Sequence, residues 1–268
     1  MNATGIADYV FVQHLGAGNH GEFWLATPPA RLGRPPGEHV AVKTLAQRAS
    51  DNDFARMANE LRVYASITSP FLLPVLDAGH QNGRLFYATP YCPDGSLGQP
   101  ARPHGRGEVR QAAADAGRAA HELHQAGVAH RDIKPSNILL AGGRGHLSDL
   151  GLAQVINPGQ TVTGIGPVGT IEYLSPEVVR GDRASRASDI WALGVTLHRV
   201  LTGRPIYQDL PTSSLRDALR QVLQDRPLID AGLSEAERAV IARCLALEPA
   251  DRYPTAEAFA DDVERIAD

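Results

Sequence analysis

The sequence predicts an α+β fold in which a small β-rich part with one helix precedes a larger helical part. Two observations indicate this division. Residues 1–91 show the alternating and β-branched segments typical of strands, whereas apolar residues recur at helical spacing from Glu108 onward. The 268 residues are enough for two small lobes that share a cleft. We therefore expect an N-terminal lobe over residues 1–91 and a C-terminal lobe over residues 92–268.

The first part is expected to contain strands joined by turns rich in glycine and proline. Pro28–Gly37, with four prolines and two glycines, is expected to be a loop, and Gln81–Gly83 is expected to be a hairpin turn. Apolar residues on one face of Asp51–Ile67 predict a helix. The expected strands are Tyr9–Leu15, Glu22–Ala26, His39–Leu45, Val75–Ala78 and Leu85–Tyr91.

The second part begins with an alanine-rich helix over Glu108–Gln125, after a loop over Pro100–Gly107. Two short strands, Ile138–Leu140 and His146–Ser148, are expected on either side of a glycine-rich turn. Further helices are expected over 189–201, 214–224, 235–246 and 255–266.

Composition narrows the function classes. A formal charge of −4 and a pI near 6.2 argue against a dedicated nucleic-acid binder. No apolar run approaches the ~20 residues needed to cross a bilayer, and Met1–Val10 shows no signal peptide. The two cysteines, Cys92 and Cys244, have no metal-binding spacing. Such a low cysteine count fits a reducing compartment, so we expect a cytoplasmic location.

The segment His130–Asn137 carries groups suited to phosphoryl transfer. Asp132 can act as a general base, Lys134 supplies a cation two positions later, and the Asn137 amide oxygen can hold magnesium.

Gly16–Gly21 lies between two predicted strands, and its three glycines let backbone N–H groups approach a polyphosphate. This strand-to-strand turn is unlike a dinucleotide fingerprint, and no Gly-Lys-Ser/Thr follows it. Val40–Lys43 places a lysine at the end of an apolar strand. That lysine either faces inward, where an ion pair with Glu60 would neutralise it, or is exposed to water.

The order of these motifs resembles that of Hanks-type (eukaryotic-like) serine/threonine protein kinases, and the composition looks bacterial. The resemblance runs from about residue 9 to 265 and implies the bilobal protein-kinase fold. It rests on Gly16–Gly21, Val40–Lys43, Glu60, the 130–137 stretch, Asp149-Leu150-Gly151, Ser175-Pro176-Glu177, Asp189 and Arg252.

The resemblance implies an active kinase that transfers the γ-phosphate of Mg-ATP, with Mn²⁺ as the alternative metal, to protein Ser/Thr hydroxyls. Asp132 and Lys134 would act at the reacting groups, Lys43 braced by Glu60 would contact phosphates, and Asn137 and Asp149 would hold the metal. His130 is instead expected to be structural and to pack beneath Leu150. Lysine two residues after the catalytic Asp resembles serine/threonine rather than tyrosine kinases.

The nucleotide-binding residues are implied in the same way. Thr89 matches the position that limits the depth of the adenine pocket, and Pro90–Cys92 matches the hinge. The thiol of Cys92 is expected to be a packing group. Phe23 replaces the usual valine, and Leu150 the usual phenylalanine of the magnesium motif. The implied residues are Leu15, Gly16, Gly18, Gly21, Phe23, Ala41, Lys43, Pro90, Cys92 and Leu139.

Regulation and docking are also implied. Arg131 beside the catalytic Asp resembles kinases activated by phosphorylation, with Thr161 and Thr163 as acceptors; the alternative is a polar loop in which both threonines are incidental. Thr170 would bond the catalytic Asp and Lys. A buried Glu177–Arg252 ion pair and Asp189 would be scaffold elements.

The resemblance implies two kinds of partner. One is protein substrates, and the other is a second copy of the chain, with which it would form a transient homodimer during autophosphorylation. No nucleic acid or membrane segment is expected.

Two other functions are considered, a pseudokinase scaffold and a small-molecule phosphotransferase. The complete set of catalytic residues argues against the first, and Gly169-Thr170 with the Ser-Pro-Glu motif and its Arg argues against the second. His121 and His124 have a helical spacing that could share a metal, but a solvated or core helix face is favoured. His20 is expected to be exposed.

Overall fold

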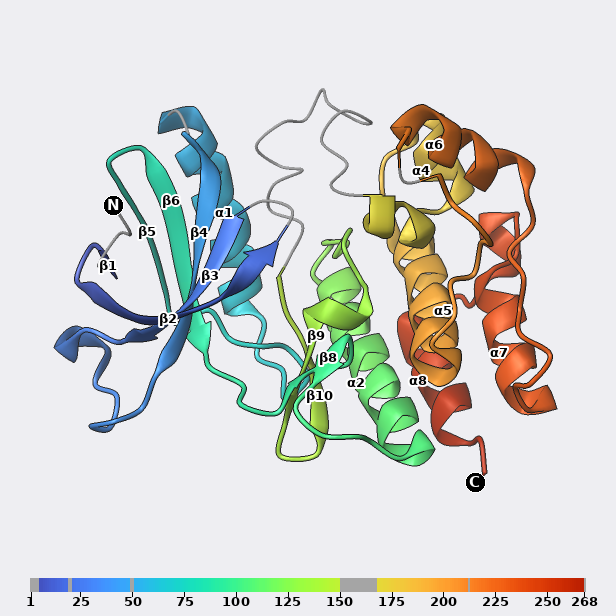
Figure 1. The fold of residues 1–268 in the computed structure, drawn as a ribbon, viewed down its shortest axis with the longest axis horizontal. Helices are drawn as coiled ribbons and strands as arrows, with labels where there is room; N and C mark the ends of the chain where they lie inside the picture. The colour runs from blue at the N-terminus through green and yellow to red at the C-terminus, as the bar shows by residue number, and fades with distance from the viewer. Residues whose placement is uncertain (1–4, 19–20, 49–50, 150–167, 212, 268) are drawn as a thin grey trace. The chain divides into compact units, whose positions relative to one another are not determined.

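The structure is a computed structural model that describes residues 5–18, 21–48, 51–149, 168–211 and 213–267. The described residues form two compact units (Figure 1). The first is drawn from residues 5–68 and 73–91, and the second from residues 69–72, 92–149 and 168–267.

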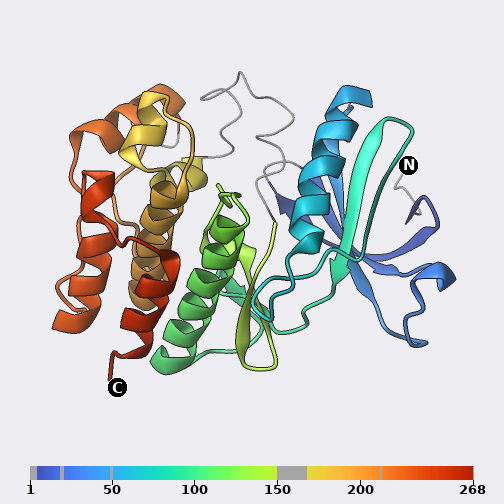
Figure 2. The ribbon, with the colours of Figure 1, turned by 180° about the vertical axis from the view of Figure 1, so that it is seen from behind.

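The first unit is an antiparallel sheet with one long helix. The strand order is β1-β2-β3-β4-β6-β5, so β1 to β4 follow the order of the chain and β6 lies between β4 and β5. Helix α1 lies along this sheet (Figures 1 and 2). The elements are β1 Gly5–Ile6, β2 Tyr9–Gly18, β3 Gly21–Thr27, the 3-10 helix η1 Ala30–Leu32, β4 Val40–Arg48, α1 Asp51–Ser66, β5 Asp77–Gln81 and β6 Arg84–Pro90.

Side-chain alternation gives the sheet two distinct faces. Val40 and Val42 of β4 are fully buried in an apolar cluster with Phe86 and Ala88 of β6. Because successive residues of a strand point to opposite faces, Lys43 lies on the other face. The hydrophobic pattern of β4 therefore determines the face on which this lysine lies.

The β5–β6 turn corrects a predicted boundary. The strand expected over Val75–Ala78 is observed over Asp77–Gln81, next to a two-residue turn. Asn82 and Gly83 have φ of 52° and 75°, the combination required by the tight hairpin turn that matches strand twist. The paired segments therefore extend to Gln81 and Arg84, one residue on each side of the turn.

The second unit combines a small sheet, of order β10-β9-β7-β8, with packed helices. Helix α2 packs against α5, α8 and strand β10. Figure 2 shows α2 and α8 side by side. The elements are β7 Gly95–Ser96, β8 Gln99–Pro100, α2 Arg106–Gln125, η2 Pro135–Asn137, β9 Ile138–Ala141, β10 Arg144–Leu147, η3 Val168–Tyr173, α4 Pro176–Arg180, α5 Arg186–Thr202, α6 Leu215–Gln224, α7 Glu235–Cys244, η4 Pro249–Asp251 and α8 Ala256–Glu264.

Small residues let α2 approach its neighbours closely. A Cβ added at Gly117 would lie 2.8 Å from the Phe259 ring of α8, and one at Gly145 would lie 2.6 Å from the Ala112 carbonyl oxygen. Six alanines of α2 are buried as well. The alanine-rich composition of this helix therefore reflects close packing on several sides.

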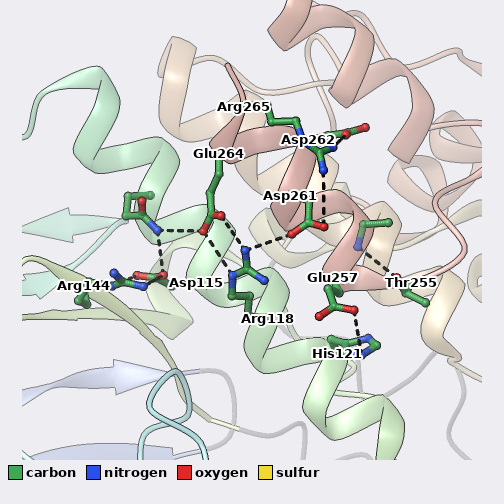
Figure 3. A network of polar contacts seen from close by, with 12 residues as sticks. Asp115, Arg118, His121, Arg144, Thr255, Glu257, Asp261, Asp262, Glu264 and Arg265 are labelled. Carbon is green, nitrogen blue, oxygen red and sulfur yellow. Dashed lines mark hydrogen bonds and ion pairs between the residues drawn. The ribbon is translucent and has the colours of Figure 1, made fainter. Parts of the chain in front are cut away.

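Polar contacts also join α2 to its neighbours (Figure 3). Arg118 of α2 contacts Glu264 at 2.6 Å and Asp261 at 3.1 Å, both on α8. On the same helix, Asp115 binds Arg144 of β10 at 2.6 Å. These contacts connect α2 to α8 and to the β9–β10 hairpin, which follows the 130–137 segment.

Helix α5 begins earlier than the predicted 189–201 segment. Its N-cap is Ser185, whose N–H donates to Ser188 Oγ at 2.8 Å, and Gly203 ends it with φ 69°. The short helices η3 and α4 were not predicted from periodicity, because they are too short to show it. Among the residues that the structure describes, no helix is long and apolar enough to cross a membrane.

Candidate active site

The 130–137 segment connects α2 to β9 and gathers three of the predicted residues. The Lys134 ammonium donates to both carboxylate oxygens of Asp132, at 2.9 Å each. Asn137 Nδ2 donates to Asp132 Oδ2 at 3.0 Å and to the Asp132 carbonyl oxygen at 2.7 Å. The Asp132 carboxylate is therefore oriented from two sides, and 15% of its side chain is accessible to solvent.

Asn137 and Asp149 offer oxygen ligands suited to magnesium. Because Asn137 uses its Nδ2 toward Asp132, its Oδ1 is available as a ligand, with only a 3.4 Å contact from the Ser136 hydroxyl. Ser148 N–H and Oγ both donate to the Asn137 carbonyl, at 2.8 and 3.0 Å, and Asp149 follows directly. An amide oxygen and a carboxylate are ligands that Mg²⁺ accepts, so this donor set fits the implied metal.

His130 is fully buried, and its hydrogen bonds determine its tautomer. Its Nδ1 accepts from the Asp132 N–H at 3.3 Å, so the proton lies on Nε2, which donates to the Ser148 carbonyl at 3.0 Å. Burial lowers the pKa of His130, although nearby carboxylates oppose this shift. The ring is therefore hydrogen-bonded both to the 130–137 segment and to Ser148, the residue before Asp149. The predicted contact with Leu150 involves a residue outside those that the structure describes.

The loop backbone is strained at Arg131, which has φ 73°, a region unfavourable for residues with a Cβ. Asp189 at the start of α5 stabilises this conformation. Its Oδ2 accepts from the His130 N–H at 2.7 Å, and its Oδ1 accepts from the Arg131 N–H at 2.9 Å. Asp149 also has a positive φ, 60°.

Glu177 and Arg252 form a two-point ion pair. Nη1 lies 2.7 Å from Oε1 and Nη2 lies 2.9 Å from Oε2. Burial pushes the pKa of Glu177 up, but the Arg252 hydrogen bonds and charge outweigh it, so the net pKa is lowered. Arg252 also donates to three backbone carbonyls and stacks over Trp191, 5.0 Å from the ring centre.

In the first unit, the glycine-rich turn is a hairpin between β2 and β3. Gly16 pairs with Phe23, and Gly18 with Gly21. At Gly21, φ is 158°, and a Cβ would lie 1.9 Å from the Thr44 carbonyl oxygen, so a side chain is excluded on steric grounds. Leu15, beside the turn, is partly exposed.

Lys43 is buried in the sheet. Its Nζ lies 4.9 Å from the Phe23 ring centre and 5.9 Å from that of Tyr87. Phe23, Lys43 and Tyr87 occupy adjacent positions on three neighbouring strands. Sequence reasoning treated Phe23 only as a larger group beside adenine, whereas its ring also faces the ammonium. Glu60 lies on α1, but its side chain is outside the described part, so the Lys43–Glu60 pair stays a prediction.

The other implied nucleotide-binding residues lie on strands or follow them. Ala41 pairs with Thr89, and Val40 with Pro90. Cys92 is buried, and burial, with a smaller effect of Asp94, raises the pKa of its thiol to about 11, so the thiol is neutral at pH 7. Leu139 lies on β9 in the second unit, opposite His146.

The structure does not test the predictions made for several residues. Thr161, Thr163 and His20 lie outside the described residues. Thr170 lies in η3 and is partly buried; its contacts with the catalytic Asp and Lys stay predicted.

One buried polar contact was not predicted. His124, grouped with His121 as a helix-face residue, instead points its Nε2 at Asp189 Oδ2, 2.8 Å away. The partner is 65 positions away, so no local pattern could have revealed this contact.

Comparison with known proteins identifies the family. A model described as the protein kinase domain matches residues 9–263. The chain belongs to the protein kinase family. This family member is 35% identical over 271 residues to the serine/threonine-protein kinase PknB of Mycobacterium tuberculosis, covering 96% of the chain and 42% of PknB. It is 34% identical to PknD of the same species, covering 92% of the chain and 38% of PknD.

Solved structures give the same result. The crystal structure of the Mycobacterium tuberculosis PknI kinase domain matches with a TM-score of 0.72 and 27% identity, over 98% of each chain. The predicted family and the α+β kinase fold are thus confirmed. The chain spans about two-fifths of the length of the curated relatives it matches.

Proposed function

We propose that this chain is the catalytic part of a serine/threonine protein kinase that transfers the γ-phosphate of ATP to protein hydroxyls. The observation that carries this proposal is the Asp132 carboxylate, oriented by Lys134 and Asn137 in a loop whose strained backbone Asp189 stabilises. Phosphoryl transfer needs little covalent participation by the protein and depends on positioned charges, which this loop provides.

Each residue of the loop has a separate proposed role. Asp132 accepts or orients the proton of the substrate hydroxyl, and Lys134 offsets negative charge on the transferred group. Asn137 Oδ1 and the Asp149 carboxylate hold Mg²⁺, with Mn²⁺ as the alternative. When bound, the metal neutralises phosphate charge.

The first unit is proposed to bind the nucleotide. Because Gly16 and Gly18 carry no side chain, phosphate oxygens are proposed to approach the backbone of the glycine-rich hairpin there, and Lys43 is proposed to supply an ammonium to them. Support comes from the burial of Lys43 on a strand face, where the rings of Phe23 and Tyr87 already orient the side chain. Within this unit, adenine is proposed to contact Leu15 and Ala41; a contact with Leu139 of the second unit stays an implication of the family resemblance.

The proposed substrates are protein serines and threonines. Lys134 two residues after Asp132 supports this class, and so do the named kinase relatives. The alternative readings, a pseudokinase or a small-molecule phosphotransferase, have less support. The first conflicts with the ordered set around Asp132, and the second does not explain the buried Glu177–Arg252 pair.

A more specific proposal concerns how activity is regulated. We propose that a second copy of the chain phosphorylates Thr161 or Thr163 and that the phosphate raises activity, with Arg131 as the cation that binds it. Equal activity of wild type and a Thr161→Ala/Thr163→Ala double variant would contradict this. A cytoplasmic location stays a prediction from composition.

One assay tests the proposed function. The chain is incubated with γ-labelled ATP and Mg²⁺, alone and with a generic basic protein, beside Asp132→Asn. We expect label on serine or threonine for the wild type and at least a hundredfold less for the variant. No transfer by the wild type would favour the pseudokinase, and transfer only to small molecules would favour the small-molecule phosphotransferase.

A further inference from the structure

Phe23, Lys43 and Tyr87 lie on β3, β4 and β6, three neighbouring strands of the first unit (Figure 1). Phe23 pairs with Lys43, and Lys43 pairs with Tyr87. Residues directly opposite each other in antiparallel strands point to the same face of the sheet, with their Cβ atoms about 4.5–5.5 Å apart. The two aromatic rings therefore flank the lysine side chain on one face.

The Lys43 ammonium lies within range of both rings. Its Nζ is 4.9 Å from the Phe23 ring centre and 5.9 Å from that of Tyr87, and cation–π attraction extends to about 6 Å. Only 5% of Lys43 is exposed to solvent, so little water weakens this attraction. Because the attraction falls with distance, the nearer ring, that of Phe23, contributes the larger share.

Phe23 differs from the other two residues in its access to solvent. Lys43 and Tyr87 are buried, whereas Phe23 is partly exposed. A ligand on this face can therefore contact the Phe23 ring while the same ring contacts the ammonium. The family resemblance implies valine at this position, and valine has no ring to attract a cation. Phenylalanine thus adds a contact with Lys43 that the implied valine cannot make.

The position of the ammonium matters because a lysine has a flexible four-carbon stem, and ordering it costs conformational entropy. A contact that orders the ammonium before a ligand arrives reduces the entropy lost on binding. We infer that Phe23 is a positioning residue for Lys43 and thereby makes the site bind nucleotides that carry phosphates in preference to nucleosides. The inference rests on the proposed function, and the contact is additional to the predicted Lys43–Glu60 pair.

Five variants separate contact with the ammonium from contact with the base. Phe23→Leu keeps an apolar side chain but removes the ring, whereas Phe23→Tyr keeps the ring. Lys43→Met removes the cation, alone and together with Phe23→Leu. Phe11→Leu is the matched control on the neighbouring strand β2. The Phe11 ring stacks on Trp24, 4.6 Å between ring centres, and packs against the apolar cluster on the other face of the sheet.

Titration calorimetry measures the dissociation constants of a non-hydrolysable ATP analogue with Mg²⁺ and of adenosine. We expect Phe23→Leu to weaken binding of the analogue about fivefold more than binding of adenosine. Phe23→Tyr should retain most of the wild-type preference, and Phe11→Leu should match wild type. In the Lys43→Met background, Phe23→Leu should leave the ratio of the two constants unchanged, because the ring then has no cation to position.

Three results would overturn the inference. The first is an unchanged ratio in Phe23→Leu, since the ring would then act on the base alone. The second is the same change of ratio with and without Lys43, and the third is a tyrosine variant that behaves like the leucine variant. Should Phe23→Leu fail to fold by circular dichroism, Phe23→Met replaces it, because methionine also lacks a ring.

A second measurement, made without nucleotide, separates this inference from the proposed function. Ring currents shift the NMR signals of groups that lie over an aromatic ring, so the signals of the Lys43 Cε protons should move in Phe23→Leu and stay unchanged in Phe11→Leu. Unmoved signals in Phe23→Leu would show that its ring does not position the lysine. If the wild type binds neither the analogue nor adenosine, the proposed function fails, and the NMR comparison alone decides whether Phe23 positions Lys43.

Discussion

Arg252 and Glu177, 75 residues apart in sequence, form a buried two-point ion pair, with N–O distances of 2.7 and 2.9 Å. The Arg252 side chain is fully inaccessible, and 12% of the Glu177 side chain is accessible. The pair joins the start of α4 to the residue that follows η4. It therefore fixes the segment after η3 to the helical core of the second unit.

Replacing Arg252 by methionine should destabilise the protein strongly. The change leaves the Glu177 carboxylate buried without its partner and removes the donors to three backbone carbonyls, so we expect a loss of about 3–5 kcal/mol in the free energy of unfolding. Urea unfolding followed by circular dichroism measures this loss.

The matched control for this variant is Arg204→Met. Arg204 pairs with Asp230 at 2.8 Å, but 75% of the Arg204 side chain is exposed. Exposed pairs contribute about 0–1 kcal/mol, so the control should change little. Equal losses in the two variants would show that burial does not determine the contribution of the Glu177–Arg252 pair.

Residue patterns in the sequence predict contacts between site residues that are close in the chain, but not contacts between residues that are far apart in it. The spacing of Asp132, Lys134 and Asn137 brings them together because all three lie in one short loop. The Glu177–Arg252 contact was expected only from the family resemblance, since no periodicity links positions 75 apart. The strand and helix pattern similarly predicted the main elements, while the short β7, β8, η3 and α4 were too short to show a pattern.

Two contacts were missed for physical reasons. His124 and His121 are three residues apart on a helix, yet the His124 ring contacts Asp189 of α5, whereas the His121 ring lies 3.6 Å from Glu257 of α8. Helical spacing alone does not reveal which neighbour each face meets. The position of Phe23 beside Lys43 depends on the register of β3 and β4, which bulges in the neighbouring β2–β3 pairing make hard to predict.

Stability should fall in acid partly through Glu237 at the start of α7. The Arg106 hydrogen bonds, at 2.7 and 2.6 Å, lower its pKa to about 2, against an ordinary value of 4.5. As pH falls, the Glu237 carboxylate is therefore protonated at a higher pH in the unfolded chain than in the folded protein. The stability that Glu237 contributes is fully present above about pH 4.5 and is lost progressively toward pH 2.

Arg106→Met tests this dependence. Removing the guanidinium moves the folded pKa of Glu237 back toward its ordinary value, so the variant should be less stable at pH 7 and lose less stability between pH 5 and pH 3. Urea midpoints at several pH values measure both effects. The control is Arg216→Met, an exposed arginine of α6, which should give a curve parallel to that of wild type. A variant curve as steep as that of wild type would contradict the assignment to Glu237.

Asn137 should determine how much magnesium the enzyme needs. Its Nδ2 donates to Asp132 and its Oδ1 is the proposed metal ligand, so Asn137→Ala removes the proposed ligand together with the hydrogen bonds that orient Asp132. We expect the Mg²⁺ concentration for half-maximal activity to rise about tenfold and kcat to fall. Ser136→Ala, at the exposed neighbouring position, removes only a 3.4 Å contact and should leave both values unchanged. An Asn137→Ala variant with lower kcat but an unaltered Mg²⁺ requirement would restrict Asn137 to supporting Asp132. In that case Asp149 would be the remaining metal ligand proposed from this chain.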